Sequence, residues 1–135
     1  MKKVRVFIER AKDGWYSAYL PDEDNLEYGL FGEGRTFEET ISDFKAVHKS
    51  QKENYAKRGD KFTEVEFIFS YDVPSMLNYY AGKFSFAGLS KLTGVSAAQL
   101  SQYAAGYRNP SAKTTQKIQT ALNAFGNELS NLQLI

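Results

Sequence analysis

Several residue types are scarce or absent in this chain of 135 residues, which has no cysteine, one histidine and three prolines. Without cysteine, the chain cannot form a disulfide, a thiolate metal site or a cysteine nucleophile. No apolar run approaches the length of a membrane-spanning helix, and the first residues lack the apolar core of a signal peptide. These absences predict a soluble, cytoplasmic protein with no membrane partner.

The titratable side chains do not form a catalytic or metal-binding pattern. The single histidine, His48, has no second histidine or cysteine with which to complete a metal site, so we expect a structural, hydrogen-bonded role for it. Glu38, Glu39 and Asp43 fall in the first turns of a predicted helix, where the helix dipole favours negative charge. The sequence therefore predicts a protein that is not an enzyme and that holds no cofactor or metal.

Charge is divided unevenly between the two halves of the chain. Residues 1–70 contain 12 lysines and arginines against 14 aspartates and glutamates, a net charge of −2. Residues 71–135 contain 5 against 2, a net charge of +3. The positive half coincides with the helical region described below, although a difference of this size decides little alone.

The first half alternates between apolar and polar residues, a pattern typical of β-strands. The apolar positions of the first strand are Val4, Val6 and Ile8. A hairpin signal at Asp13-Gly14 leads into a second predicted strand at 15–20. A third strand is predicted at 26–31, and we expect Gly32 and Gly34 to break it.

A helix and a fourth strand complete this half. Thr36 and Glu39 form a capping box, and the helix behind it is expected to run to about Tyr55 and to be ended by Arg58-Gly59-Asp60. Its apolar stripe comprises Phe37, Ile41, Phe44, Val47, His48 and Tyr55. The fourth strand alternates over 65–70. The order β-β-β-α-β predicts a mainly antiparallel sheet with one helix packed across a face.

Beyond residue 72 the periodicity becomes helical. Pro74 suits the first turn of a helix, and Pro110-Ser111 opens a longer helix that Gly126 is expected to close. We predict a two-domain α+β protein in which a short linker at 70–73 separates the domains. The predicted boundaries are 1–70 for the sheet domain and 74–135 for an all-α domain of five helices.

The run 86–111 can be parsed as two short helices joined by a tight turn. Gly94 suits the left-handed conformation that ends the first helix. Ser96 and Gln99 form a capping box at the start of the second. The apolar residues expected to hold the two helices together are Leu89, Leu92, Val95, Leu100 and Tyr103. Small and amide side chains on the outer face of the second helix suit entry into a DNA major groove.

This run resembles the Cro/cI-type helix-turn-helix family. The matching residues are Leu89, Gly94-Val95-Ser96, Leu100-Ser101, Tyr103, Gly106 and Arg108-Asn109-Pro110-Ser111. The resemblance implies binding to double-stranded operator DNA. By position, the residues expected to face base edges are Ala97, Ala98 and Gln102. Those expected to approach phosphates are Ser96, Ser101, Tyr107 and Arg108. The few cations favour a homodimer or higher homo-oligomer that reads two half-sites.

The first half resembles the HicB antitoxin family. The matching motifs are Gly14-Trp15-Tyr16, Leu20-Pro21-Asp22 and Gly34-x-Thr36-x-Glu38-Glu39. The resemblance implies a partial RNase H-like domain that binds a HicA-like mRNA-cleaving toxin, in a type II toxin-antitoxin pair that represses its own operon. The toxin-contacting residues within 1–70 are not identified. Two alternatives stay open: a stand-alone repressor with a ligand pocket at Trp15 or Tyr19, and a metal-dependent nuclease.

Two further groups of residues bear on partner binding. The acidic residues Asp22, Glu23, Asp24 and Glu27 are interpreted as a solvated loop, with a cation site or a phosphate mimic as alternatives. The aromatic residues are Trp15, Tyr16, Tyr19, Tyr28 and Phe31. We expect the core to bury most of them and any remainder to form an apolar patch for a partner.

Overall fold

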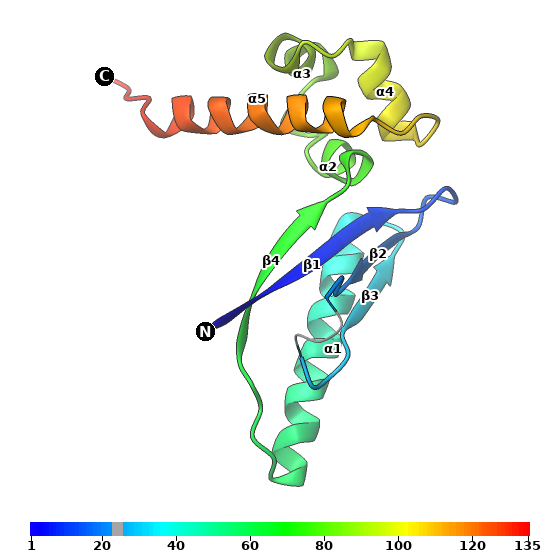
Figure 1. The fold of residues 1–135 in the computed structure, drawn as a ribbon, viewed down its shortest axis with the longest axis vertical. Coiled ribbons are helices and arrows are strands. Elements are labelled where there is room, and N and C mark those ends of the chain that lie inside the picture. Colours follow the sequence, from blue (N-terminus) through cyan, green and yellow to red (C-terminus); the bar gives the residue numbers. More distant parts are fainter. Residues whose placement is uncertain (23–25) are drawn as a thin grey trace. The chain divides into compact units, whose positions relative to one another are not determined.

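The computed structural model describes residues 1–22 and 26–135, which form two compact units, Met1–Ser75 and Met76–Ile135. The strands are β1 (Lys2–Arg10), β2 (Tyr16–Tyr19), β3 (Phe31–Gly34) and β4 (Val65–Tyr71) (Figure 1). The helices are α1 (Phe37–Arg58), α2 (Val73–Tyr79), α3 (Phe86–Thr93), α4 (Ala97–Ala105) and α5 (Ala112–Ser130). The mixed α+β class, with strands first and helices after, is confirmed.

The first unit is a four-stranded sheet in the order β3-β2-β1-β4, with α1 packed on one face (Figure 1). β1 pairs antiparallel with β2, and β2 with β3, whereas β1 and β4 run parallel. Val4, Val6 and Ile8 are almost fully buried, as the alternation in β1 predicts. Phe44 from α1 is also fully buried and completes the centre of this core. The predicted β-β-β-α-β order and mainly antiparallel sheet are therefore confirmed.

The third strand lies later in the chain than predicted and contains the two glycines expected to break it. β3 begins at Phe31 and includes both Gly32 and Gly34. A Cβ on Gly32 would lie 2.6 Å from the backbone nitrogen of Phe44, and one on Gly34 would lie 2.7 Å from Cβ of Glu39. The prediction was wrong because these glycines allow a close approach of α1, a use that the sequence pattern does not separate from strand breaking.

Both ends of α1 have the caps expected from the sequence. The Thr36 hydroxyl accepts the backbone N–H of Glu39 at 3.1 Å, and the Glu39 carboxylate accepts the N–H of Arg35 at 2.9 Å. Gly59 ends the helix with a φ of +74°, which only glycine adopts without strain. The helix therefore extends one turn beyond Tyr55 and ends at Arg58, at the Arg58-Gly59-Asp60 stretch predicted to end it.

No linker separates β4 from α2. β4 ends at Tyr71 and α2 begins at Val73, with only Asp72 between them. The Asp72 carboxylate accepts the backbone N–H groups of Arg10 and Ser75, at 2.9 and 2.8 Å. The predicted linker at 70–73 was wrong, because one aspartate ties the end of β1 to the first turn of α2.

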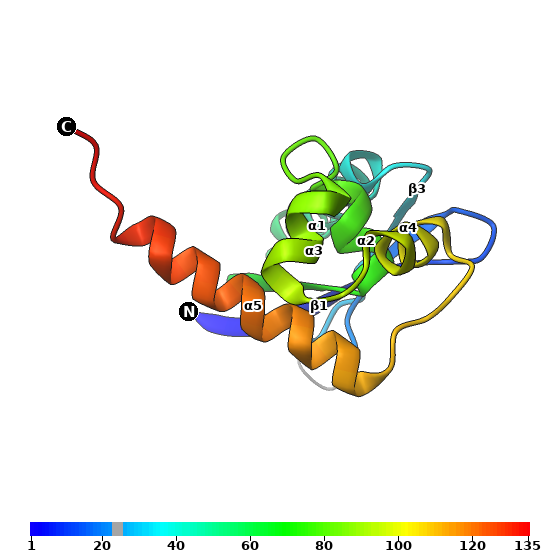
Figure 2. The same cartoon turned by 90° about the horizontal axis from the view of Figure 1, so that it is seen from above.

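Four helices, not five, follow the sheet in the part of the chain that the structure describes. α5 runs through Gly126 to Ser130, so the expected stop at that glycine was wrong. Ser111 accepts the N–H of Thr114 at 3.1 Å and caps the start of α5. Figure 2 shows α5 passing alongside α3, with α4 set at an angle to α3. The buried apolar side chains of the second unit are Leu77, Leu89, Val95, Leu100, Tyr103 and Ile118.

Candidate nucleic-acid interface

The turn between α3 and α4 is fixed by local hydrogen bonds. Gly94 has a φ of +75° and donates its N–H to Ser90, which ends α3 in the left-handed cap predicted from the sequence. Thr93 is buried, donates its hydroxyl to the Leu89 carbonyl at 2.7 Å and accepts the Val95 N–H at 3.1 Å. Thr93 satisfies the buried polar groups of the turn, and the sequence pattern did not predict this role.

α4 begins at the serine that the capping box identified. The Ser96 hydroxyl accepts the backbone N–H of Gln99 at 3.1 Å. The Gln99 side chain contacts the same hydroxyl, at 3.3 Å, instead of bonding back to the Ser96 amide. Gly106 closes the helix with a φ of +81°. A helix of nine residues is therefore capped at both ends.

The inner face of α4 is buried and holds the helix in place. Leu100 is 0% exposed and Tyr103 5%, in the same core as Leu89 and Val95. The Asn78 side-chain amide donates to the Ala104 carbonyl at 2.9 Å and so ties α2 to the last turn of α4. The sequence pattern identified these apolar contacts correctly, but it gave no sign of the bond from Asn78.

The residues predicted to contact DNA are all exposed. They are Ser96, Ala97, Ala98, Ser101, Gln102, Tyr107 and Arg108. The first five lie along the outer side of α4, including its cap, and the last two follow its final glycine. Tyr107, the one large hydrophobic side chain among them, is 84% exposed. The structure therefore leaves all seven residues accessible at the surface of this unit.

Gln102 and Arg108 are linked. Arg108 Nη1 lies 3.4 Å from Gln102 Oε1, and the Tyr107 N–H donates to the Gln102 carbonyl at 3.0 Å. The side-chain bond is long and exposed, so breaking it costs little. Gln102 can therefore present both its amide nitrogen and its oxygen to a base edge, while Arg108 stays close enough to reach a neighbouring phosphate.

Lys113 and Lys117 add positive charge that the sequence analysis did not assign. They lie one turn apart on α5, and together with Thr93 and Gln116 they line a groove in the second unit. Lys117 Nζ lies 3.2 Å from where a Cβ on Gly94 would be, so it reaches the turn between α3 and α4. In the sequence, only the four-residue spacing of these lysines indicated that they share one face of a helix. That this face lies beside the turn between α3 and α4 follows from the packing of α5 against α3.

Comparison with known proteins agrees with this geometry. Residues 87–124 match the helix-turn-helix family model, which covers α3, α4 and most of α5. No curated protein and no solved structure matches the chain. The second unit contains a helix-turn-helix domain, the fold of sequence-specific transcription regulators that bind double-stranded DNA.

Three of the acidic residues in the first unit, Asp22, Glu39 and Asp43, form bonds that hold the fold. Asp43 accepts the backbone N–H of Glu33 at 2.9 Å, and Glu39 accepts that of Arg35. Asp22 forms a two-point ion pair with Arg5, at 2.9 and 3.0 Å. Glu23 and Asp24, the centre of the predicted acidic loop, lie outside the described residues. No three histidine, aspartate or glutamate side chains within residues 1–22 and 26–135 come together as a metal site would require.

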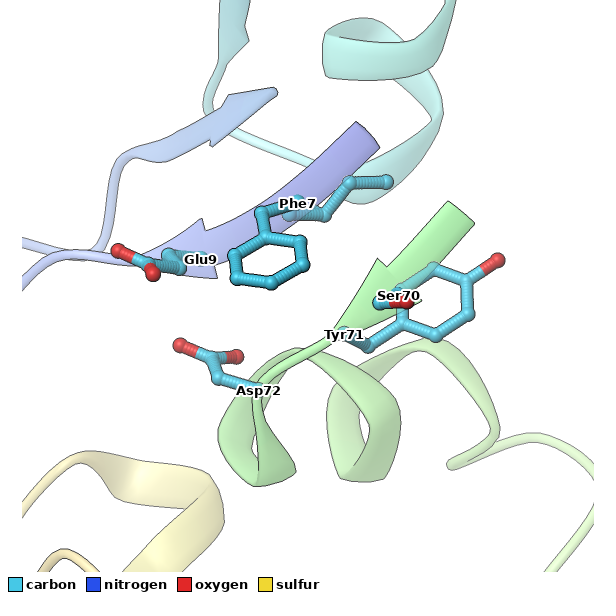
Figure 3. A pocket seen from close by; sticks show the side chains of 6 residues that line it. Phe7, Glu9, Ser70, Tyr71 and Asp72 are labelled. Atoms are coloured by element: carbon cyan, nitrogen blue, oxygen red, sulfur yellow. The ribbon is translucent and has the colours of Figure 1, made fainter. Parts of the chain in front are cut away.

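A small hollow of about 160 Å³ lies where β1 and β4 end, and it contains two carboxylates. Figure 3 shows Glu9 and Asp72 beside the ring of Phe7 at this hollow. Glu9 accepts the hydroxyl proton of Tyr19 at 2.6 Å, and Asp72 accepts the two backbone N–H groups described above. Both carboxylates are therefore engaged in bonds that hold the fold.

The hydrogen bond to Glu9 raises the pKa of Tyr19 to about 12. Because this pKa is higher in the folded state than in the unfolded chain, the folded state holds the phenol proton more tightly. The stability from this bond is complete below about pH 10 and falls as the pH rises from 10 to 12. We expect Tyr19→Phe to be less stable than wild type at pH 9 and to lose less stability between pH 9 and 11, as measured by urea denaturation.

Tyr107→Phe is the matched control, since that hydroxyl is exposed and lies in the other unit. It should reproduce the wild-type loss of stability between pH 9 and 11. Tyr16 and Tyr28, whose pKa values are raised by burial, stay in every variant and provide a common background. An unchanged pH dependence in Tyr19→Phe would rule out the role assigned to the Glu9 bond.

His48 lies among aromatic rings, not in a polar site. Its ring centroid is 5.1 Å from that of Phe67 and 5.5 Å from that of Phe62. Its Nε2 is buried and has no hydrogen-bond partner among the described residues, so the hydrogen bond expected of His48 is not found at Nε2. Packing against neighbouring rings, not hydrogen bonding at Nε2, accounts for its position.

The aromatic residues of the hairpin region divide differently from the prediction. Tyr16 and Tyr28 are buried, whereas Trp15 and Phe31 are 40% and 50% exposed. The Arg35 guanidinium lies 5.1 Å from the Trp15 ring centroid. Tyr19 is half-buried, so the core takes fewer of the five than expected. Phe31 is exposed because β3 turns alternate side chains away from α1. None of the helices in the described part of the chain is both long and apolar enough to cross a membrane.

Proposed function

We propose that the chain is the antitoxin of a type II toxin-antitoxin pair, which represses its own operon through the helix-turn-helix unit and neutralises a HicA-like mRNA-cleaving toxin through the sheet unit. The DNA-binding part of this proposal depends mainly on one observation. The outer side of α4, from Ser96 to Gln102, is exposed, capped and free of bulky or acidic side chains. That is the surface a recognition helix needs in order to enter the major groove.

In this proposal the side chains on α4 have distinct roles. Gln102 pairs with an adenine edge through its amide, and Ala97 or Ala98 contacts a thymine methyl group. Ser96, Ser101, Tyr107 and Arg108 approach phosphates, which orient the domain without reading sequence. With so few cations, one domain binds weakly, so we propose that a homodimer reads two half-sites.

Gln102→Ala and Arg108→Ala separate these two roles. We expect Gln102→Ala to lose roughly 1–3 kcal/mol of discrimination at one base pair and to bind unrelated DNA as before. Arg108→Ala should weaken binding to all sequences alike and lower the slope of log affinity against log salt by about 1. Fluorescence anisotropy measures both, with a sequence that the wild-type chain selects from a random pool and a scrambled version of it.

Gln119→Ala is the control, because it truncates an exposed glutamine on α5 whose amide bonds only Asn123 on the same helix. It should leave affinity and specificity unchanged. If Gln102→Ala and Arg108→Ala reduce affinity for every sequence equally, then the assignment of base reading to one and phosphate binding to the other fails. If neither has an effect, α4 does not contact DNA.

Toxin neutralisation is proposed for the first unit, as a HicB-like domain that occludes the RNA-binding surface of its partner and does no chemistry. Two apolar side chains that it exposes, Trp15 and Phe31, support a protein partner. The test is co-purification with small basic proteins encoded beside the gene. A partner whose RNA cleavage stops when it binds supports the proposal, and the absence of any such partner removes it.

A metal-dependent nuclease is the enzyme alternative to this proposal. The purified chain should leave labelled RNA intact in Mg²⁺ or Mn²⁺, because the carboxylates described above are engaged in structural bonds. Cleavage that a carboxylate substitution such as Glu9→Gln abolishes would overturn the proposal that the chain only blocks a toxin.

A stand-alone, ligand-responsive repressor is the second candidate, and one feature favours it. A hollow in the first unit is lined by Tyr19, Leu20 and the segment 26–30, although Trp15 does not contribute to it. A small apolar ligand there should change DNA affinity. Screening a metabolite library by the shift in melting temperature, followed by the anisotropy assay, distinguishes this candidate from the antitoxin.

A further inference from the structure

The two edges of the sheet differ in how well they are protected against pairing with another strand. β3 forms one edge with only four residues, two of them glycine. β4 forms the other edge with seven residues that include no proline, lysine or arginine and a single charge, at Glu66. Natural proteins protect exposed edges with short strands, prolines or lysines, and β4 has none of these devices.

The outward backbone groups of β4 can be identified from its pairing with β1. Ile8 lies opposite Tyr71 in the parallel register, and the Asp72 N–H donates to the Ile8 carbonyl at 3.0 Å. Backbone groups alternate along a strand, so residues 66, 68 and 70 also point their amides toward β1. The amides of the odd-numbered residues therefore point away from β1. No strand pairs with that side within residues 1–22 and 26–135.

The side chains of β4 divide between the two faces of the sheet. Phe67 and Phe69 contact Phe44 of α1, with ring centroids 5.2 and 6.1 Å apart. Tyr71 likewise contacts Phe37, at 5.3 Å. Ile68 lies on the opposite face, which α1 does not cover, and is 43% exposed. An apolar side chain at the middle of an unprotected edge marks a site for association.

We propose that β4 pairs antiparallel with β4 of a second copy of this chain, about a two-fold axis at Ile68. The strand reads Val-Glu-Phe-Ile-Phe-Ser-Tyr, and its central three residues, Phe-Ile-Phe, are the same in both directions from Ile68. In this register Phe67 lies opposite Phe69 of the partner subunit, on the α1 face. Glu66 lies opposite Ser70 of the partner subunit, so no like charges meet. Self-complementarity of this kind is what a two-fold interface requires.

The backbone supports the same register. Because Ile68 directs its amide toward its own β1, the two copies of Ile68 form a non-hydrogen-bonded pair, in which side chains approach most closely. The flanking odd-numbered residues then form the hydrogen-bonded pairs. Centring the axis on Phe69 would pair fewer residues of the strand and would set Glu66 opposite Asp72 of the partner subunit. Only the axis at Ile68 pairs all seven residues of β4.

Ile68→Cys tests this pairing directly, because the chain has no cysteine of its own. Residues of a non-hydrogen-bonded pair have Cα atoms about 4.5 Å apart, within the range of about 4.4–6.8 Å that disulfides span. We expect mild oxidation to convert the variant to a covalent dimer on a non-reducing gel. The matched control is Phe31→Cys, which places a similarly exposed thiol on β3.

The rate of cross-linking decides the outcome. Ile68→Cys should cross-link at least about tenfold faster than Phe31→Cys, because its two thiols meet within one complex and not by random collision. Equal rates would overturn the proposal. Circular dichroism of both reduced variants establishes that the fold is unchanged.

A charge exchange at the same position is an independent test. Ile68→Lys and Ile68→Glu should each sediment at half the wild-type molar mass, because the two-fold axis places each new charge against its own copy. An equimolar mixture should regain the wild-type mass through Lys–Glu pairs. Failure of either variant to dissociate, or of the mixture to reassociate, contradicts the proposal. The proposal does not depend on DNA or toxin binding, so adding Gln102→Ala to the Ile68→Cys variant should leave its cross-linking rate unchanged.

Discussion

Replacing Gly32 with alanine is expected to destabilise the first unit by about 3 kcal/mol, the upper end of the usual cost of overpacking a core. The new Cβ would lie 2.6 Å from the Phe44 nitrogen and 2.7 Å from the Thr40 carbonyl oxygen. Both are backbone atoms within a helix, so neither can move without displacing α1 from the sheet. Since small domains are stable by only about 5–15 kcal/mol, this is a large fraction of the total.

The measurement can be confined to the affected unit. Trp15 is the only tryptophan and belongs to the first unit, so its fluorescence during urea denaturation reports that unit. Gly29→Ala is the control, because a Cβ there meets nothing within 4 Å. It should be neutral or slightly stabilising, since alanine lowers the entropy of the unfolded chain. Equal denaturation midpoints for Gly32→Ala and Gly29→Ala would show that α1 does not pack closely on β3.

Leu100→Ala should have a comparable effect on the second unit. Leu100 is 0% exposed at the centre of the helix-turn-helix core, so its truncation leaves a cavity and should cost roughly 2–5 kcal/mol. The outer face of α4 is chemically unchanged by the substitution. Any loss of DNA affinity would therefore come from loss of the folded state and should be recovered on cooling toward the temperature of maximum stability.

Far-UV circular dichroism during thermal unfolding measures the change, with Leu134→Ala as the control at a site that is 90% exposed. The control should unfold at the wild-type temperature and bind DNA normally. If Leu100→Ala unfolds at the same temperature as the control, α4 is not held by the core described above. If it stays fully folded but loses DNA binding, Leu100 acts on recognition and not on stability.

The local features of the fold could be predicted because their causes lie within a few residues. The caps at Thr36, Ser96, Gly94 and Gly59 each follow from a side chain or a missing Cβ that acts on the adjacent turn of backbone. The alternation in β1 likewise identifies a buried face from one strand alone. The helix-turn-helix and its exposed residues could be recognised for the same reason.

The features that were mispredicted depend on segments far apart in the chain. Gly32 looks the same in sequence whether it breaks a strand or lets α1 approach, and only Phe44 and Thr40 decide between the two. Asp72 reads as a loop residue until its bond to Arg10, 62 positions away, shows that it joins two elements. Lys117 similarly gains a role only through its closeness to Gly94.

The contrast between the two sheet edges sets a limit on assembly. If only the β4 edge can add a strand, then a subunit that has paired with a second copy cannot bind a third, because the short, glycine-containing β3 offers little backbone for another chain to extend. With the β4 pairing proposed above, association therefore stops at two subunits and does not continue into fibrils. A polymer would require two sheet edges on every subunit that can each pair with another strand. The four-residue β3 is too short to provide the second of these edges.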